Sequence, residues 1–378
     1  MSAAKSSDLS ANPTGPAFLS GPMSSLVDLV RIVAAGAVVI YHSLGVHFHS
    51  GQPYVGPLGS HYAVVVFFVV SGLAVASGAG RARGLADYAL ARATRIVPVA
   101  LLAMALGVAV FLLRGPIAVI EPYRGHETLT WQSVVHPLLF LTESANGQLP
   151  VWNAPWWSLS YEVWYYALFG AAVFLKGPRR AIWLVALAWL AGPQILLLLP
   201  VWLMGAALAR WPALTRLDRR QGTALVVAGL AMFLLARSVD MAALAWVERH
   251  TPIPLVNSQN VVGNLLVGLA VTFGLAGLRP LLPLLAAPIA RIAPALRWGA
   301  GMTFTAYLTH QPLIAFACSW GLVAPPGLPG ALAAIGSVLA VCALLAHLCE
   351  RRSPALRRAV ERWLERTRQT SALAPATA

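Results

Sequence analysis

The sequence predicts an all-α polytopic membrane protein with about ten transmembrane helices and with both termini in the cytoplasm. Hydrophobic residues make up 58% of the 378 positions and charged residues only 11%, whereas a soluble domain carries about 25% charged residues. A membrane-spanning helix needs about 20 mostly apolar residues, so the chain has room for about ten spans joined by short connections. The placement of Lys and Arg then predicts the orientation.

Apolar runs separated by Pro, Gly and charged clusters predict the individual helices. They are expected at residues 26–46, 60–79, 93–113, 157–175, 181–192, 194–210, 222–238, 257–278, 300–322 and 328–350. Gly192 and Pro193 must form a very tight turn between the fifth and sixth of these segments. No polar stretch is long enough to build the core of a separate soluble domain.

The ends of the chain differ from the middle in composition. Residues 1–24 are rich in Ser, Pro, Gly and Ala and predict a disordered cytoplasmic tail, and residues 25–350 form the predicted membrane domain. Residues 351–378 predict a basic cytoplasmic tail. Its charges alternate at helical spacing, which favours a basic surface helix beside anionic lipid, so membrane lipids are expected partners.

Basic residues are distributed unequally between the two sides of the predicted membrane domain. With the N-terminus inside, 22 of the 27 Lys and Arg fall on the cytoplasmic side, four fall outside, and Arg31 lies within the first helix. Such an excess is typical of cytoplasmic loops. It accounts for the formal net charge of +14, so no nucleic-acid partner is expected. The three cysteines show no metal-ligand spacing, and no metal is predicted.

One outer connection, residues 114–156, is rich in aromatic residues up to and including the start of the following helix. Among them are Tyr123, Trp131, Trp152, Trp156 and Trp157. Aromatic side chains anchor membrane proteins at the lipid headgroups, and they also stack against sugar rings. The residues alone leave both interpretations open.

Ionisable side chains inside spans are costly and therefore mark functional candidates. In the first predicted helix, Arg31 and His42 are eleven positions apart, which places them about 20° from a common face and ~16 Å apart along the axis. Asp28 lies one turn before Arg31, well placed for an ion pair. The same spacing would also suit an arginine that reaches the inner interface and a histidine bonded at the outer one.

Two further arginines lie where the third predicted helix enters the membrane. Arg92 and Arg95 are three positions apart and so share one face of the helix. Arginine pairs bind phosphate through bidentate hydrogen bonds. Ordinary cytoplasmic positive charge is the alternative interpretation.

The fourth and ninth predicted helices carry the remaining polar candidates. Glu162 lies inside the fourth helix, with Ser158 one turn before it and Tyr165 and Tyr166 one turn after it. A carboxylate there could orient the imidazole of His42 and stabilise its protonated form. Asp28 is the alternative, and the position of Glu162 near the outer end of its helix favours Glu162. In the ninth helix, His310 is either a second polar wall of the same cavity or a structural hydrogen-bonding group.

Six sequence strings occur in order between about residue 25 and residue 350. They are VDLVRIVAAGAVVIYH, FFVVSG, RATRIVP, PWWSLSYEVWYY, YLTHQP and a final Glu-Arg pair before the basic tail. In this order the series resembles acyltransferase family 3, the OafA-like bacterial membrane O-acyltransferases. Two strings depart from the family pattern: the opening string lacks a glycine, and the closing Glu-x-Pro is stretched between Glu350 and Pro354. Glu350 is therefore assigned no catalytic role.

The resemblance implies roles for individual residues. Arg31 and His42 match the family's Arg-x10-His pattern, in which the histidine is the proposed catalytic residue. Arg92 and Arg95 match its Arg-x-x-Arg pattern, which is associated with the acyl-CoA donor. Ser158 and Glu162 match its Trp-Ser-Leu-x-x-Glu segment. The expected catalytic set is therefore His42, Glu162 and Arg31, with Arg92 and Arg95 at the donor. Ser158 is expected at the substrate, together with Tyr165 and His310 from the polar faces of their helices.

The resemblance also implies an activity and a location. The expected reaction moves an acyl group, acetyl by preference, from cytosolic acetyl-CoA to a hydroxyl of a surface or exported polysaccharide or its lipid-linked precursor. The expected location is the bacterial cytoplasmic (inner) membrane. A small glycoside such as a macrolide is an alternative acceptor. A proton-coupled transporter would use similar polar residues, but such folds commonly contain internal repeats, and none is evident between the halves of this chain.

Overall fold

The computed structural model describes residues 17–44, 60–114, 128–143, 147–251, 255–322, 325 and 327–373. These residues form helices and connecting turns without strands, which confirms the predicted all-α class. The α-helices are α1 (Gly21–Ser43), α2 (Ser60–Ala79), α3 (Leu85–Arg114), α4 (Gln132–Leu138), α5 (Trp156–Phe174), α6 (Gly177–Arg210), α7 (Arg219–His250), α8 (Val261–Leu278), α9 (Ala286–Ala300), α10 (Thr303–Ser319), α11 (Leu328–Leu348) and α12 (Ser353–Leu373). Four short 3-10 helices are η1 (Pro212–Thr215), η2 (Val256–Ser258), η3 (Arg279–Leu285) and η4 (Glu350–Arg352).

Seven helical segments of the described residues are long and apolar enough to cross a membrane. They comprise α1, α2, α3, α6, α7, α8 together with α9, and α11 together with α12. The chain is therefore a multi-pass membrane protein, although these segments number fewer than the ten predicted. The helices α5 and α10 are absent from this set. Both carry several buried polar residues, which a helix surrounded by other helices tolerates better than one that faces lipid.

Several predicted boundaries need correction. Helix α1 begins at Gly21, so the end of the expected 1–24 tail is helical, and residues 1–16 lie outside the described residues. The expected connection at 279–299 is itself helical, as η3 and α9. Gly192 has a φ of 81° and interrupts α6, as expected for the turn between the fifth and sixth predicted segments. Glycine adopts positive φ without the steric penalty of a Cβ.

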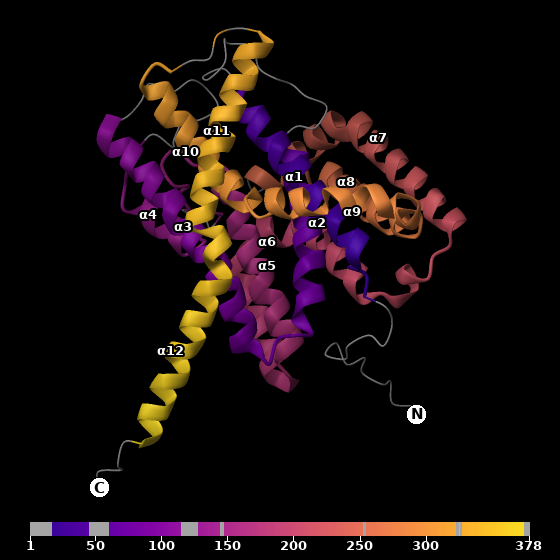
Figure 1. The fold of residues 1–378 in the computed structure, drawn as a ribbon, viewed down its shortest axis with the longest axis horizontal. Helices are drawn as coiled ribbons and strands as arrows, with labels where there is room; N and C mark the ends of the chain where they lie inside the picture. Colours follow the sequence, from indigo (N-terminus) through magenta and orange to yellow (C-terminus); the bar gives the residue numbers. More distant parts are fainter. Residues whose placement is uncertain are drawn as a thin grey trace.

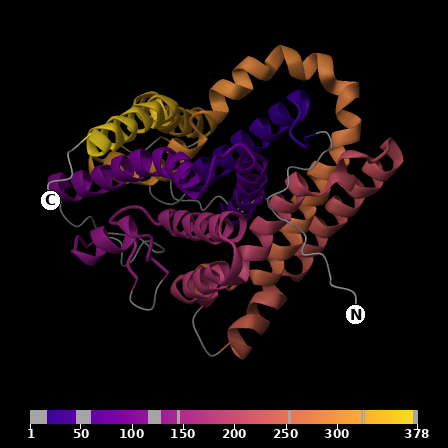
Figure 2. The same ribbon diagram turned by 90° about the horizontal axis from the view of Figure 1, so that it is seen from below.

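Figure 1 shows the helices as a bundle in which α5 and α6 lie near the centre and α7 and α8 flank one side. Helices α7 and α8 contact each other along much of their length, as do α2 and α6. Seen from below in Figure 2, the chain from α8 through η3 curves round into α9, which returns to contact α1. Helix α12 continues the direction of α11 and is tied to α3 by an ion pair between Arg357 and Asp87 of 2.5 Å.

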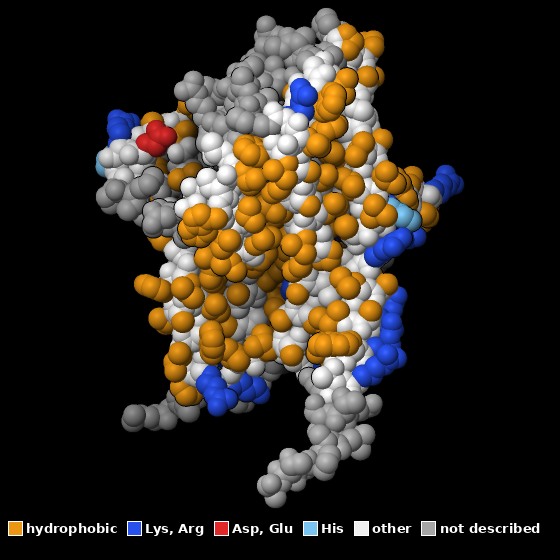
Figure 3. Space-filling model, turned by 90° about the vertical axis from the view of Figure 1, so that its left-hand side faces the viewer, with side chains coloured by type: hydrophobic (Ala, Val, Ile, Leu, Met, Phe, Trp, Pro, Cys, Tyr) orange, Lys and Arg blue, Asp and Glu red, His pale blue; other side chains and the backbone are white. Residues whose placement is uncertain are grey.

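The distribution of apolar and charged side chains on the surface supports the placement of the molecule in a membrane. Figure 3 shows a broad hydrophobic area over one face, with Lys and Arg mainly at its lower end and along one edge. Large apolar side chains are exposed on several helices, for example Trp189 (80%), Val185 (70%) and Leu112 (72%). Exposed apolar surface of this extent is expected where lipid, and not water, is the solvent.

Candidate active site

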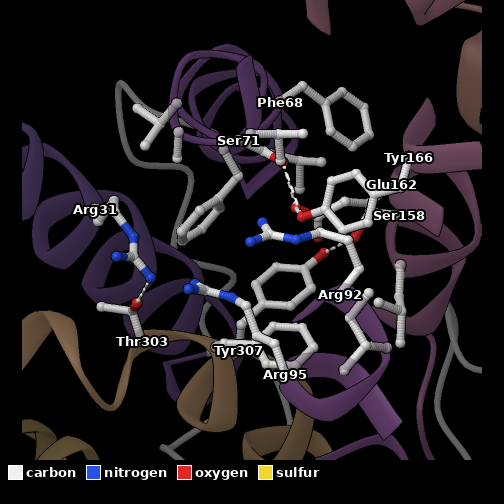
Figure 4. Close-up of a pocket in the computed structure, with 18 residues that line it drawn as sticks. Arg31, Phe68, Ser71, Arg92, Arg95, Ser158, Glu162, Tyr166, Thr303 and Tyr307 are labelled. Atoms are coloured by element: carbon white, nitrogen blue, oxygen red, sulfur yellow. Dashed lines mark hydrogen bonds between the residues drawn. The ribbon is translucent and has the colours of Figure 1, made fainter. Parts of the chain in front are cut away.

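Five helices converge on a cavity of about 90 Å³, which is large enough for several water molecules. Its polar lining comes from α1, α2, α3, α5 and α10 and consists of Arg31, Ser71, Arg92, Arg95, Ser158, Glu162, Tyr166, Thr303 and Tyr307. Figure 4 shows the guanidinium groups of Arg31, Arg92 and Arg95 pointing into a common space. The cavity thus unites five of the eight site residues expected from the sequence.

The three arginines give the cavity a positive charge. Arg31 donates a hydrogen bond of 3.1 Å to Thr303 Oγ1 and lies 3.9 Å from Asp28. The guanidinium of Arg92 lies over the Tyr166 ring at 5.7 Å, and its buried Nε has no hydrogen-bond partner among the described residues. Among the described lining residues Glu162 is the only acid. The cavity is therefore suited to an anionic ligand such as a phosphate group.

Glu162 is held by α2 and by its own helix. Its Oε1 accepts hydrogen bonds of 2.5 Å from Ser71 Oγ and from the Tyr166 hydroxyl, and Trp202 Nε1 donates to the same Ser71 oxygen at 3.3 Å. The expected pairing of this carboxylate with His42 is thus not found. Sequence spacing placed Glu162 on the correct face of α5 but could not show which neighbouring helix presents a partner.

His42 pairs instead with His310 of α10. His42 Nδ1 and His310 Nε2 are 3.0 Å apart, and His310 Nδ1 lies 3.0 Å from the carbonyl oxygen of Ala306. A carbonyl can only accept, so neutral His310 carries its proton on Nδ1 and accepts from Nδ1–H of His42. This assignment leaves the lone pair of His42 on Nε2, where it can take a proton or attack an electrophile.

The predicted common face of Arg31 and His42 is confirmed, because both side chains bond to α10. Arg31 meets Thr303 and His42 meets His310. Tyr307 lies between these two positions on α10. Its hydroxyl is 2.6 Å from Ser158 Oγ in the cavity wall, and its ring centroid is 6.3 Å from that of His310. Tyr307 therefore stands between the arginine cavity and the histidine pair.

Tyr165 lies away from the cavity. This residue is completely buried, and its hydroxyl donates to the Ile195 carbonyl of α6 at 2.8 Å. The adjacent Tyr166 occupies the cavity wall in its place. A tyrosine three positions after Glu162 points to one side of that residue and a tyrosine four positions after points to the other, so helical spacing alone could not choose between them.

Sequence reasoning missed four cavity residues as site candidates. The site residues expected from the sequence do not include Ser71, Tyr166, Thr303 or Tyr307, yet all four line the cavity. A polar stripe on α10 at Thr303, Tyr307 and His310 was the available signal. Glu350 holds the start of this helix, since its Oε2 accepts from the Thr305 N–H and hydroxyl at 2.9 Å each.

The site therefore offers a cationic cavity, a half-buried carboxylate and an imidazole with a free lone pair. Within the part of the chain that the structure describes, no three His, Cys, Asp or Glu side chains are grouped as a metal site requires. Acid-base or nucleophilic chemistry on a phosphate-bearing substrate fits these groups.

Comparison with known proteins places the chain in a family. A family model described as an acyltransferase domain, that of acyltransferase family 3, matches residues 25–347. No curated protein and no solved structure gives a match. The matched range contains every residue that lines the cavity and both histidines of the pair. The chain belongs to acyltransferase family 3 and is a membrane acyltransferase.

Proposed function

We propose that the protein is an O-acyltransferase of the bacterial inner membrane. It moves an acyl group, acetyl by preference, from cytosolic acyl-CoA to a hydroxyl of a surface or exported polysaccharide or its lipid-linked precursor. The observation that carries the proposal is the connection of a three-arginine cavity through Tyr307 to the paired imidazoles of His42 and His310.

The donor fits the arginine cavity. Acyl-CoA carries several phosphate groups, which Arg31, Arg92 and Arg95 attract and hold by charge-assisted hydrogen bonds. Glu162 is engaged by Ser71 and Tyr166, and it fixes the faces of α2 and α5 that form the cavity wall. The pantetheine arm then extends along α10 past Tyr307 toward His42.

His42 acts on the acyl group through Nε2. As a general base, it removes the proton of the acceptor hydroxyl while the hydroxyl oxygen attacks the thioester carbonyl. The carbon–sulfur bond breaks and the CoA thiolate leaves. The proton remains on the His42 imidazole. His310 stabilises the imidazolium by accepting the hydrogen bond from Nδ1–H. In a second route, Nε2 itself attacks the thioester carbonyl, and the carbon–sulfur bond breaks to release the CoA thiolate. The acyl group then passes from Nε2 to the acceptor oxygen, and the proton of that hydroxyl goes to Nε2.

The decisive variant is His42→Ala. We expect it to insert normally and to abolish acetylation of surface polysaccharide, because the described residues that line the cavity include no imidazole that could replace its lone pair. O-acetyl content is measured in cells that lack the native protein and produce each variant. The exposed His347 provides the matched control, and His347→Ala should retain full activity. Acetylation by His42→Ala at the normal level would refute the assignment.

A rapid-quench experiment separates the two routes. Purified protein is mixed with radiolabelled acetyl-CoA without any acceptor and is digested after denaturation. Label bound covalently to the peptide that contains His42 identifies the acyl-imidazole route. Label found only in acetyl-CoA and free acetate identifies general-base catalysis.

A further inference from the structure

Helix α10 contains a proline in the turn that carries His310. Pro312 has no backbone N–H, so the carbonyl of Leu308, four positions earlier, cannot accept the hydrogen bond that normally continues a helix. A proline ring inside a helix also crowds that carbonyl and bends the helix. Leu308 is 0% exposed, and a buried carbonyl needs a donor. A stable α10 therefore requires a donor from another part of the chain.

The side-chain amide of Asn153 is this donor. Asn153 Nδ2 donates to the Leu308 carbonyl oxygen at 2.8 Å, and both residues are 0% exposed. Because a carbonyl can only accept, the contact fixes which end of the amide faces α10. Asn153 belongs to the connection that precedes α5, 155 positions before Leu308. A residue far away in the sequence thus takes the place of the N–H that Pro312 lacks.

The next two residues of this connection also bond to α10. The Ala154 N–H donates to Gln311 Oε1 at 2.6 Å, and the Tyr307 hydroxyl donates to the Pro155 carbonyl at 3.2 Å. Three consecutive residues of the connection therefore bond to a stretch of α10 little longer than one turn. His310 lies within that stretch, so its position depends on these contacts.

The connection is itself held in place at Asn153. The Asn153 N–H donates to the Pro150 carbonyl at 3.2 Å and closes a turn over residues 150–153. Trp152 in this turn has a φ of 58°, which a tryptophan rarely adopts and keeps only where its surroundings hold it. Its side chain is 7% exposed and forms an apolar cluster with residues of α3. Contacts with α3 and α10 thus determine where the Asn153 amide lies.

The effect of this contact reaches His42 through His310. His310 lies two positions after Leu308 and two before Pro312. Its Nδ1 is 3.0 Å from the Ala306 carbonyl oxygen, and its Nε2 is 3.0 Å from His42 Nδ1. A hydrogen bond weakens steeply when its angle departs from the preferred range. A shift of α10 at the proline would therefore alter the orientation of the His42 ring.

We propose that Asn153 is a positioning residue for acyl transfer. Its amide replaces the backbone donor that Pro312 lacks, and so holds His310 where it accepts the hydrogen bond from His42. Asn153 acts through His310 and not on the substrate. This inference rests on the proposed function, since it concerns the histidine pair that acts on the acyl group.

The first experiment observes the histidine pair without catalysis. Protein with isotopically labelled histidine nitrogens is placed in nanodiscs for solid-state NMR, and the imidazole signals of the pair are identified by their absence from His42→Ala and His310→Ala. We expect Asn153→Ala to shift the signals of both rings. Asn257→Ala removes an amide that donates to Glu143, and as the matched control it should leave them in place. Unchanged signals in Asn153→Ala would overturn the inference.

The second experiment restores a donor within α10. Pro312→Ala returns an N–H that can reach the Leu308 carbonyl inside the helix. Asn153→Ala should lower kcat about tenfold or more with proline at position 312, and less than about twofold with alanine there. Activity is measured as consumption of radiolabelled acetyl-CoA by inside-out vesicles, divided by the amount of inserted protein. Equal losses in the two backgrounds would contradict the proposed role.

Two controls distinguish positioning from general damage to the fold. Pro294→Ala replaces a proline inside α9 and should not reduce the loss caused by Asn153→Ala. The KM of Asn153→Ala for acetyl-CoA should stay within about twofold of the normal value, since Arg92 and Arg95 belong to α3. A rise in KM as large as the fall in kcat would refute a role in positioning.

The measurements separate this inference from the proposed function. If the wild-type protein consumes no acetyl-CoA while Asn153→Ala shifts the histidine signals, the contact through His310 is supported and the proposed function fails. If the wild-type protein consumes acetyl-CoA and Asn153→Ala has the same kcat, the proposed function stands and the positioning role is refuted.

Discussion

Glu143 is a buried acid outside the membrane-spanning segments that no sequence pattern singled out. It is 7% exposed and accepts hydrogen bonds from the Tyr161 hydroxyl at 3.2 Å and from Asn257 Nδ2 at 3.1 Å. Burial raises the pKa of this carboxyl to about 7, although both hydrogen bonds act in the opposite direction. The group therefore binds its proton more tightly in the folded protein than in the unfolded chain.

The raised pKa predicts the pH dependence of stability. Between the unfolded value of 4.5 and about 7, the folded state binds more protons, so the stability contributed by this group falls as pH rises through that window. Above the window the cost is on the order of 3 kcal/mol. Glu143→Gln should therefore raise the melting temperature at pH 8 and change it little at pH 4.

Thermal unfolding in detergent at both pH values tests this prediction. Glu248 is exposed, so Glu248→Gln provides the matched control and should change the melting temperature little at either pH. An equal shift of Glu143→Gln at pH 4 and pH 8 would show that the carboxylate charge is not the cause.

At the residue scale, the sequence predicted most of the polar cavity but not its hydrogen bonds. Arg31, Arg92, Arg95, Ser158 and Glu162 line the cavity as a set, because helical spacing determines which side chains share a face. The partners come from other helices. Neither the bond from His42 to His310 nor that from Ser71 to Glu162 could be derived from spacing, since each depends on where two helices cross.

At the element scale, close contact between α2 and α6 positions Ser71 beside Glu162. A Cβ on Gly72 would collide with the Trp202 carbonyl, and a Cβ on Gly205 would collide with the Val69 carbonyl. Both obstacles are backbone atoms, which cannot move aside as a side-chain end can. Small residues permit close helix approach, so the Ser-Gly pair in FFVVSG favours such a contact, although it does not identify the partner helix.

Gly205→Ala should therefore destabilise the protein by on the order of 1–3 kcal/mol and should lower acetylation, since α2 and α6 must separate. Gly274 in α8 provides the control because a Cβ there would meet no atom within 4 Å. Gly274→Ala should be neutral or slightly stabilising, since alanine is the better helix former. Melting temperature in detergent and O-acetyl content measure the two effects. Equal destabilisation by both variants would contradict the packing argument.

At the scale of the whole molecule, the orientation in the membrane decides from which side of the membrane the acyl donor enters the cavity. The starts of α1 and α3 and the whole of α12 lie toward the same end of the bundle (Figure 1). The predicted orientation assigns this end to the cytoplasm, where Lys and Arg are in excess. The arginine cavity would then receive acyl-CoA from inside, and His42, near the end of α1, would act toward the outside.

Membrane vesicles of the two orientations test this prediction. Acetyl-CoA does not cross lipid, so inside-out vesicles should consume it when it is added externally and sealed right-side-out vesicles should not. In inside-out vesicles, replacing both Arg92 and Arg95 by alanine should raise KM for acetyl-CoA about tenfold or more, because charge-assisted hydrogen bonds to phosphate are lost.

The matched control replaces the exposed pair Arg219 and Arg220 by alanine, which should leave that KM unchanged. Consumption by right-side-out vesicles alone would reverse the orientation. An unchanged KM in the Arg92 and Arg95 variant would show that these residues serve only as positive charge on the cytoplasmic side.

The sequence by itself determined the membrane class, the polar faces of the helices and the family, because hydropathy, helical period and motif order are properties of the chain. The tertiary structure decided the rest. It paired His42 with His310, engaged Glu162 with Ser71 and Tyr166, and replaced Tyr165 by Tyr166 in the cavity wall. It also brought Tyr62, Asp240 and Asn264 together from three helices. Apart from the bond between Glu162 and Tyr166 within α5, these contacts depend on where helices distant in sequence cross, and a single helix carries no information about that position.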